Sequence, residues 1–520
     1  MKNTEKFDTA SRSFVWAIFG IGTLISLVLS IWSIGIDSVI NNDGVIYVLA
    51  AELLSSGDWE SALEIYRWPF YPWLIMLVGD TLGISYKIAG HSLNSVFFAL
   101  IVIFFVDAVR AFGGVSRMVL VIAMLIALAH PAFNEYRAFL IRDPGYLAAY
   151  LLAVCCFARH CKQPFIRYRV IATLCLVVAT LFRLEGLIFL FCAPVIFKLA
   201  NNSIASYGTR HWITLLLSIG LIVGLGSFVF SWLLTMPTSH LTSLDYMGSP
   251  VRLMLESWGY IAEGVNDKLA SLRVFLGPYS ANNTYVLFGL AVFAVLGAAI
   301  LNELTVPFSL LIAYALLRPT ANTLQGSCRK IWAALLLINV SILLVFTCIF
   351  MFLAPRYPLA ICMTLLLLVP FSASEIWARA RSISVFGRCI VIFLLVWAVG
   401  ESWSGVSNFS RNEHHRMAGV WLTQNADESS IVVTNSRKVA YYADRYNNPE
   451  IWGMEPLGLS KYFLDGSEIQ EADFVVVNLP RNDTDLATRF SELAGASPIQ
   501  IFDNGHGDWI LIFPVNNSSY

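Results

Sequence analysis

Long runs of apolar side chains constrain this chain more than any other feature of its sequence. A helix that crosses a lipid bilayer needs about 20 mostly apolar residues, within a range of about 17–25. The clearest runs cover 14–34, 88–109, 118–133, 212–235, 331–353 and 357–374; shorter ones cover 144–158, 170–182, 187–199, 286–301 and 390–403, and 68–84 and 306–317 are marginal. The sequence therefore predicts a polytopic α-helical membrane protein.

The composition of the 520 residues supports this prediction. Hydrophobic residues make up 57% and charged residues 13%, whereas soluble domains are about 25% charged. The formal net charge is −1, so no basic field is present to attract a nucleic acid. The chain also contains neither a P-loop nor a GxGxxG motif, which argues against ATP-driven transport and dinucleotide chemistry.

Lysine and arginine residues near the helix ends predict the orientation of the chain. The N-terminus carries Lys2, Lys6 and Arg12, and further basic clusters occur within 110–117, 159–169, 198–210, 318–330 and 379–388. If these segments are cytoplasmic, the chain makes about 11 crossings, or about 13 if two further short segments cross. This arrangement predicts a protein of the cytoplasmic (inner) membrane, with its N-terminus inside and its C-terminus outside.

The polar segments define the predicted domains. Residues 1–403 form a transmembrane module with outer loops at 35–87 and 236–282, and residues 404–520 form an extracytoplasmic domain. In this domain the pattern predicts helices at 410–425, 439–445 and 483–494 and strands at 430–434, 472–479, 499–502 and 509–515. This mixture is typical of a small α/β domain. Its His414–His415 pair is interpreted as a solvated helix face, not a metal site.

Asp43 is the first candidate functional residue. It follows the first predicted membrane helix and precedes an amphipathic stretch at 45–54, which we expect to lie along the outer membrane surface. An acidic residue at a membrane face often marks function. The alternative is that Asp43 only caps this helix, because aspartate is a favoured N-cap residue.

Asp143 is the second candidate, in a short connection that the topology places at the same membrane face as Asp43. Pro144 follows it and is a natural first-turn residue of a helix, so Asp143 could be another cap. It could also form a structural ion pair with the neighbouring Arg142 or Arg137.

Three arginines, Arg67, Arg183 and Arg356, are expected at this outer face as well. The planar guanidinium group binds phosphate through a fork of N–H donors. Together these side chains could hold a lipid phosphate and stabilise it as a leaving group. The alternative is that they extend to lipid headgroups, as arginines at helix ends commonly do.

The order of these motifs resembles one family. The chain is similar to the membrane-embedded GT-C glycosyltransferases, in particular to bacterial relatives of protein O-mannosyltransferases and to the lipid A aminoarabinose transferase. The resemblance covers most of the chain. It is carried by Asp43 with the helix that ends in Gly57-Asp58-Trp59, by Trp68-Pro69-Phe70-Tyr71-Pro72, by Arg142-Asp143, by Arg356-Tyr357-Pro358, and by the small outer domain.

The resemblance implies a GT-C-like fold and a transfer reaction. The donor would be a polyprenyl-phosphate sugar, and the acceptor a protein, lipid A or another glycan. Asp43 would be the catalytic base, with Asp143 orienting the acceptor or sharing that role. The implied phosphate-binding residues are Arg67, Arg183, Arg356 and Tyr357, and the implied acceptor or sugar pocket contains Asn42, Glu52, Tyr71, Arg142 and Glu185. No cofactor is required, although a divalent cation between the two aspartates and the phosphate remains an option.

Two other functions remain open from the sequence. A transporter or flippase of lipid-linked saccharides predicts charged residues in mid-membrane and internal repeats. The sequence shows few such charges and no convincing repeat. An oligosaccharide polymerase or ligase would share the topology and the lipid-linked donor, so the sequence barely separates it from a transferase of single sugars.

Overall fold

The computed structural model describes residues 9–200, 264–317, 324, 326–380, 385–406, 412–446, 472–479 and 484–515. The predicted span at 212–235 and most of the predicted loop at 236–282 lie outside these residues. The chain divides into two compact units. The helical unit comprises Met1–Val28, Val96–Asn134 and Arg142–Ser404, and the mixed unit comprises Leu29–Ser95, Glu135–Ile141 and Gly405–Tyr520.

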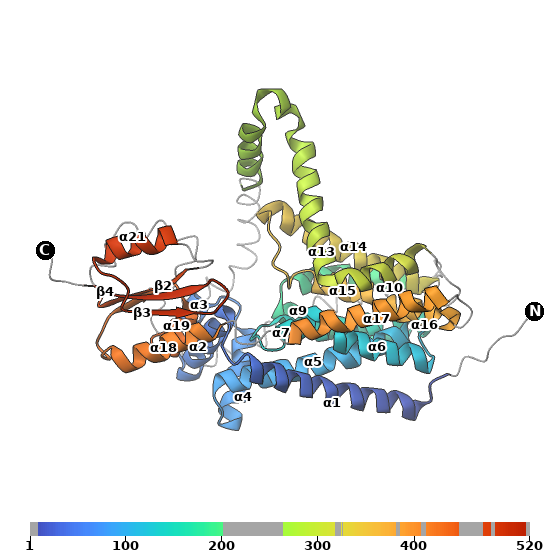
Figure 1. Cartoon of the computed structure of the whole chain (residues 1–520). Coiled ribbons are helices and arrows are strands. Elements are labelled where there is room, and N and C mark those ends of the chain that lie inside the picture. The colour runs from blue at the N-terminus through green and yellow to red at the C-terminus, as the bar shows by residue number, and fades with distance from the viewer. Residues whose placement is uncertain are drawn as a thin grey trace, which may run out of the picture. The chain divides into compact units, whose positions relative to one another are not determined.

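Helices make up most of the described part of the helical unit (Figure 1). Helices α1 (Arg12–Ile36), α5 (Tyr86–Ala111), α7 (Pro131–Tyr136) and α17 (Val385–Val406) contribute residues to both units. The remaining helices of the unit are α6 (Arg117–Ala129), α8 (Asp143–Lys162), α9 (Ile166–Phe182), α10 (Glu185–Ala200), α13 (Thr284–Leu317), α14 (Ser327–Phe350), α15 (Leu359–Leu366) and α16 (Val369–Ala380). They coincide with the apolar runs of the sequence.

Several helices have the length and composition of membrane spans. Within the described residues these are Arg12–Ile36, Tyr86–Ala111, Gly264–Leu317, Ser327–Phe350 and Leu359–Arg379. Large apolar side chains on their surfaces are exposed, for example Leu24 and Ile31 of α1. Such exposure is favourable in lipid and costly in water. The protein is therefore a multi-pass membrane protein, as the sequence predicts.

The structure refines four of the predicted apolar runs. The runs at 286–301 and 306–317 form the single element α13, which is broken at Thr305 (φ 58°, ψ 164°) just before Pro307. Proline cannot donate the helical hydrogen bond and favours such a break. The run at 357–374 divides into α15 and α16. The marginal run at 68–84 becomes α4 (Phe70–Leu82), whose 13 residues are fewer than a straight crossing requires.

The mixed unit contains a four-stranded sheet in the order β1-β2-β4-β3. Strands β1 and β2 are parallel, whereas β2 with β4 and β3 with β4 are antiparallel. Its C-terminal elements are α18 (Glu413–Asn425), β1 (Val432–Thr434), α19 (Arg437–Tyr442), β2 (Phe474–Leu479), α21 (Thr484–Ala494), β3 (Gln500–Asp503) and β4 (Trp509–Pro514). The predicted α/β pattern of this region is confirmed.

Helices cover both faces of the sheet. Successive side chains of a strand point to opposite faces, so each strand contributes to both of the resulting cores. On one face Val475 and Val477 of β2 pack with Phe490 of α21. On the other face Val476 packs with Leu422 of α18. The fold therefore has three layers, with helices on each side of the sheet.

The interpretation of His414 and His415 as a solvated face was wrong. Both side chains are buried, because α18 packs against the segment from β1 to α19. Ser436 Oγ and His415 Nδ1 lie 2.9 Å apart and form a hydrogen bond. Burial is the largest cause that lowers the pKa of His415 well below its usual value, followed by the charge of Lys438.

The N-terminal part of the mixed unit consists of α2 (Asn42–Ser56), α3 (Trp59–Ile65) and α4. Helix α2 is extensively buried; its Val45, Val48 and Leu49 pack in clusters with tyrosines of the C-terminal region and with Ala440 of α19. It ends at Gly57, which adopts the left-handed conformation (φ 85°) typical of a helix C-terminus. The segment that contains Asp43 therefore belongs to the same compact body as the C-terminal sheet.

Candidate functional site

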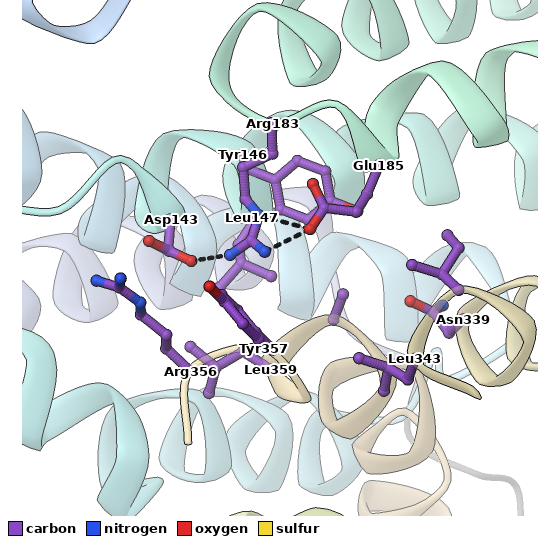
Figure 2. Close-up of a pocket in the computed structure, with 12 residues that line it drawn as sticks. Asp143, Tyr146, Leu147, Arg183, Glu185, Asn339, Leu343, Arg356, Tyr357 and Leu359 are labelled. Atoms are coloured by element: carbon purple, nitrogen blue, oxygen red, sulfur yellow. Dashed lines mark hydrogen bonds and ion pairs between the residues drawn. The ribbon is translucent and has the colours of Figure 1, made fainter. Parts of the chain in front are cut away.

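A recess in the helical unit collects charged side chains that are distant in the sequence (Figure 2). It measures about 380 Å³ when the part open to solvent is included. The lining residues come from α8, the α9–α10 turn with the start of α10, α14, and the start of α15 with the segment before it: Asp143, Tyr146, Leu147, Arg183, Glu185, Asn339, Ile342, Leu343, Arg356, Tyr357, Leu359 and Ala360.

Arg183 is the centre of the charged cluster. Its Nη1 forms an ion pair with Asp143 Oδ1, and its Nη2 forms one with Glu185 Oε1. Its Nε also donates to Glu185 Oε1 at 3.1 Å. Only 9% of the Arg183 side chain and 5% of the Asp143 side chain are exposed. Because the pair is buried, its charges interact more strongly than a surface pair would.

Two tyrosine rings also contact the Arg183 guanidinium group. The guanidinium carbon lies 4.9 Å from the centre of the Tyr357 ring and 5.8 Å from that of Tyr146. Arginine over an aromatic face gains a cation–π attraction and loses rotational freedom. The Tyr146 ring in turn stacks on Tyr150 with a centroid distance of 6.1 Å. The orientation of Arg183 is therefore set by two carboxylates and two rings.

Two glycines allow the backbone to bring these groups together. A Cβ atom on Gly145, in the first turn of α8, would lie 2.4 Å from the ring of Phe182, which immediately precedes Arg183. A Cβ atom on Gly186 would lie 2.4 Å from the backbone nitrogen of Thr180. The start of α8 and the α9–α10 turn can therefore approach closely only because both positions lack a side chain.

We expect Gly186→Ala to destabilise the helical unit by about 1–3 kcal/mol, because the methyl group would collide with backbone that cannot move aside easily. The same change displaces Arg183 and Glu185, so activity should fall with stability. Thermal unfolding in detergent measures the first effect. Gly289→Ala in α13 is the matched control, since its added Cβ would have no described atom within 4 Å beyond its chain neighbours and the nearby backbone of its own helix. An unchanged unfolding temperature for Gly186→Ala would contradict this packing.

A buried hydrogen-bond network lies beside the recess and connects α8, α14 and α15. Asn339 Nδ2 donates to the hydroxyl of Tyr150 at 3.0 Å, and that hydroxyl lies 2.8 Å from Thr364 Oγ1. Trp332 Nε1 donates to the carbonyl of Thr364 at 2.8 Å. Satisfied polar networks of this kind fix the positions of helices in an apolar environment.

A turn after α14 presents Arg356 and Tyr357 to the recess. Helix α14 ends at Phe350, and the left-handed conformation (φ 50°) of its C-cap residue Met351 redirects the chain. The backbone N–H of Tyr357 donates to the carbonyl of Ala354 at 2.9 Å. The Tyr357 ring packs edge-on against Phe346 with a centroid distance of 4.8 Å. Figure 2 shows the Arg356 side chain on the Asp143 side of the recess.

The structure thus brings together five of the residues selected from the sequence, namely Asp143, Arg183, Glu185, Arg356 and Tyr357. Arg142 occupies the N-cap position of α8, next to Asp143. The sequence suggested Arg142 or Arg137 as the ion-pair partner of Asp143. The structure shows an ion pair of Asp143 with Arg183, and Arg137 Nη1 donates to Ser30 Oγ at 2.9 Å. The roles of these residues remain predictions.

Sequence reasoning missed Tyr146 and Asn339. Tyr146 could have been found, because it lies three residues after Asp143 and therefore on the same face of α8. Asn339 carries a weaker signal, as a lone amide within the apolar helix α14.

Asp43 and Asn42 lie in the first turn of α2, in the mixed unit. The suggestion that Asp43 is the N-cap was wrong, because the N-cap is Asn41 with extended backbone angles. The Asn41 side chain instead fixes a second segment. Its Oδ1 accepts from the N–H of Leu140 at 2.7 Å, and its Nδ2 donates to the carbonyl of Leu140 at 3.1 Å.

Three other predicted pocket and phosphate residues are also in the mixed unit. Glu52 of α2 accepts a hydrogen bond from the Tyr446 hydroxyl at 2.7 Å, and burial raises the pKa of its carboxyl group. The hydroxyl of Tyr71 is buried and donates to Asn94 Oδ1 at 2.9 Å. Arg67 is exposed between α3 and α4. In the ranges that the structure describes, no three His, Cys, Asp or Glu side chains are grouped to hold a metal ion.

Comparison with known proteins identifies the fold. No family model and no curated protein matches the sequence. The chain is similar to the crystal structure of ArnT from Cupriavidus metallidurans in the apo state, with 12% identity, a TM-score of 0.55, and 96% of this chain and 98% of ArnT covered. ArnT is a GT-C glycosyltransferase. This chain has a GT-C-like fold.

Two further structures resemble this GT-C-like chain. One is ArnT from the same organism bound to undecaprenyl phosphate, with 12% identity, a TM-score of 0.55, and 98% of this chain and 100% of ArnT covered. The other is the Archaeoglobus fulgidus oligosaccharyltransferase tethered with an acceptor peptide, with 12% identity and a TM-score of 0.48. That similarity covers 93% of this chain and 71% of the oligosaccharyltransferase.

Proposed function

We propose that this protein transfers a sugar from a polyprenyl-phosphate-linked donor to an acceptor at the outer face of the cytoplasmic membrane. The acceptor is a protein, lipid A or another glycan. The recess carries the proposal, because it gathers Arg183, Arg356 and Tyr357 beside an ordered carboxylate. The similarity to ArnT bound to undecaprenyl phosphate supports a lipid-linked donor. The basic flanks of the helices support a cytoplasmic N-terminus and an external C-terminal domain.

The phosphate of the donor would bind at the basic side chains. A guanidinium group has five N–H donors, and the contacts of Arg183 with Asp143 and Glu185 use three of them. Its other N–H groups, with those of Arg356 and the hydroxyl of Tyr357, would neutralise the phosphate as negative charge develops on it. In this proposal Arg183 has a second role, since it also fixes the carboxylate of Asp143 in the recess. Arg67 would be a further ligand of the phosphate.

The transfer itself needs one base and one leaving group. The acceptor hydroxyl attacks the anomeric carbon, the bond from that carbon to the phosphate oxygen breaks, and the polyprenyl phosphate leaves. The proton of the acceptor passes to the carboxylate of Asp43, while Asp143 orients the acceptor. Attack opposite the leaving phosphate inverts the anomeric configuration. Asn42, Glu52, Tyr71, Arg142 and Glu185 would contact the sugar or acceptor.

Binding of undecaprenyl phosphate to the purified protein tests the recess. We expect Arg356→Gln to weaken this binding by roughly 10- to 100-fold, because a hydrogen bond to a charged group contributes about 1.5–3 kcal/mol. Native mass spectrometry with a titrated lipid measures the change. Arg379→Gln is the matched control, since Arg379 forms an ion pair with Glu375 on α16 and does not line the recess. Equal affinity of both variants and the wild type would refute the phosphate site.

A further inference from the structure

One hydroxyl group of the C-terminal domain makes two hydrogen bonds to the segment that precedes Asp43, beside a longer bond from Arg416 Nη1 to Ser38 Oγ at 3.4 Å. This hydroxyl belongs to Tyr442, the last residue of α19. It accepts a hydrogen bond from the backbone N–H of Ile40 at 3.0 Å and donates one to the carbonyl of Ser38 at 3.2 Å. One side chain therefore satisfies two backbone groups of the short connection between α1 and α2.

Lys87 completes this contact from the start of α5. Its Nζ donates to the carbonyl of Ser38 at 2.6 Å and to the hydroxyl of Tyr442 at 3.2 Å. It also lies 5.5 Å from the centre of the Tyr442 ring, within the range of a cation–π interaction. We call Ser38, Ile40, Lys87 and Tyr442 the tyrosine clamp.

The segment between α1 and α2 is also fixed by contacts outside the tyrosine clamp. Ile40 is completely buried, and the side chain of Asn41 makes two hydrogen bonds with the backbone of Leu140. Helix α2 begins at Asn42, so Asp43 follows this doubly held connection directly. A further contact supports the middle of α2, where the Tyr446 hydroxyl donates to Glu52 and Leu49 packs with Ala440.

We infer that Tyr442 is a positioning residue for the transfer reaction, through which the C-terminal domain sets the place of Asp43. This inference rests on the proposed role of Asp43 as the base. A carboxylate must lie within hydrogen-bond distance of the proton that it accepts. A displacement of about 1 Å can reduce a reaction rate by about 100-fold. The domain thereby takes part in catalysis without touching the substrate.

A purely structural role for the contact makes a different prediction. In that case, loss of the hydroxyl would lower the stability of the mixed unit, but each folded molecule would turn over at the normal rate. A positioning role instead lowers kcat per folded molecule. It leaves the KM for the donor nearly unchanged, because the proposed phosphate site lies in the helical unit and not at the clamp.

The test compares Tyr442→Phe with Tyr441→Phe in the full-length protein. Both rings pack in the same cluster, but of the two hydroxyls it is that of Tyr442 that makes hydrogen bonds to the segment before α2. We expect Tyr442→Phe to lower kcat by about 10-fold or more with a KM for the donor within about 2-fold of wild type, and Tyr441→Phe to leave both unchanged. Lys87→Met, which removes the second contact with Ser38, should change kcat in the same direction.

Each outcome has a separate meaning. If Tyr442→Phe and Lys87→Met turn over at the wild-type rate while Asp43→Asn is inactive, the positioning inference is overturned and the proposed function stands. A loss of protein or of thermal stability with a normal kcat per folded molecule also overturns it. If Asp43→Asn remains active, the proposed role of Asp43 fails, and the inference fails with it.

Discussion

Replacement of Arg183 by methionine is expected to abolish transfer and to lower the free energy of unfolding by about 3–5 kcal/mol. The change leaves two carboxylates, those of Asp143 and Glu185, without the cation that neutralises them. Removing one partner of a buried ion pair costs more than the pair itself contributes, because the remaining charge stays out of water. Thermal unfolding in detergent and a transfer assay measure the two effects.

A compensated variant separates stability from chemistry. Arg183→Met combined with Asp143→Asn and Glu185→Gln removes all three charges, so we expect it to recover most of the lost stability but none of the activity. Arg159→Met is the matched control, because Arg159 forms an ion pair with Asp107 at 2.5 Å and does not line the recess. It should lose stability while each folded molecule remains active. If Arg183→Met unfolds at the wild-type temperature, the ion pairs of Arg183 do not stabilise the fold, and the prediction is contradicted.

Asp43→Asn is expected to lower kcat by roughly 100- to 10,000-fold, the range that a positioned general base contributes. The substitution keeps the size of the side chain and should leave the fold intact. Asp43 lies in the first turn of α2, where its charge contributes only about 0.3–1 kcal/mol through the helix dipole. The amount of protein in membranes and a transfer assay are the two measurements.

Asp58→Asn is the matched control for this prediction. Asp58 caps α3, where it accepts a hydrogen bond from the backbone N–H of Ser61 at 3.1 Å, and an asparagine oxygen can accept the same bond. We expect this variant to retain activity. An active Asp43→Asn variant would refute the assignment of the base, because asparagine cannot accept the proton at neutral pH.

Most of the fold could be predicted because its signals are local. In the C-terminal domain the predicted helices and strands agree with the structure to within three residues at each end, from α18 (Glu413–Asn425) to β4 (Trp509–Pro514). Alternation along the strands and apolar spacing along the helices are contained in short windows of sequence. The break of α13 at Thr305 lies between the predicted runs 286–301 and 306–317, but the left-handed backbone of Thr305 could not be predicted, since that residue type gives no sign of it.

The candidate site was predictable as a set of residues but not as a geometry. The sequence predicted Asp143 and Arg183 at one membrane face. Their ion pair, however, joins residues that are 40 positions apart, so it depends on how two helices pack. The two helices can approach closely because Gly145 has no side chain where the ring of Phe182 packs, and no local sequence pattern predicts this contact. The same limit explains the error at His414 and His415, whose burial is decided by the packing of α18 against distant elements.

The central claim is that this protein moves a sugar from a lipid-phosphate donor. Mass spectrometry of membranes from a deletion strain, complemented with the wild type or with Asp43→Asn, tests it most directly. The claim predicts that the Asp43→Asn membranes contain the protein, accumulate the donor lipid, and lack one sugar on a protein, lipid A or glycan acceptor. Identical lipid-linked sugars and acceptors in the two complemented strains would contradict it, and donor lipid retained at the cytoplasmic face of the membrane would favour a transporter.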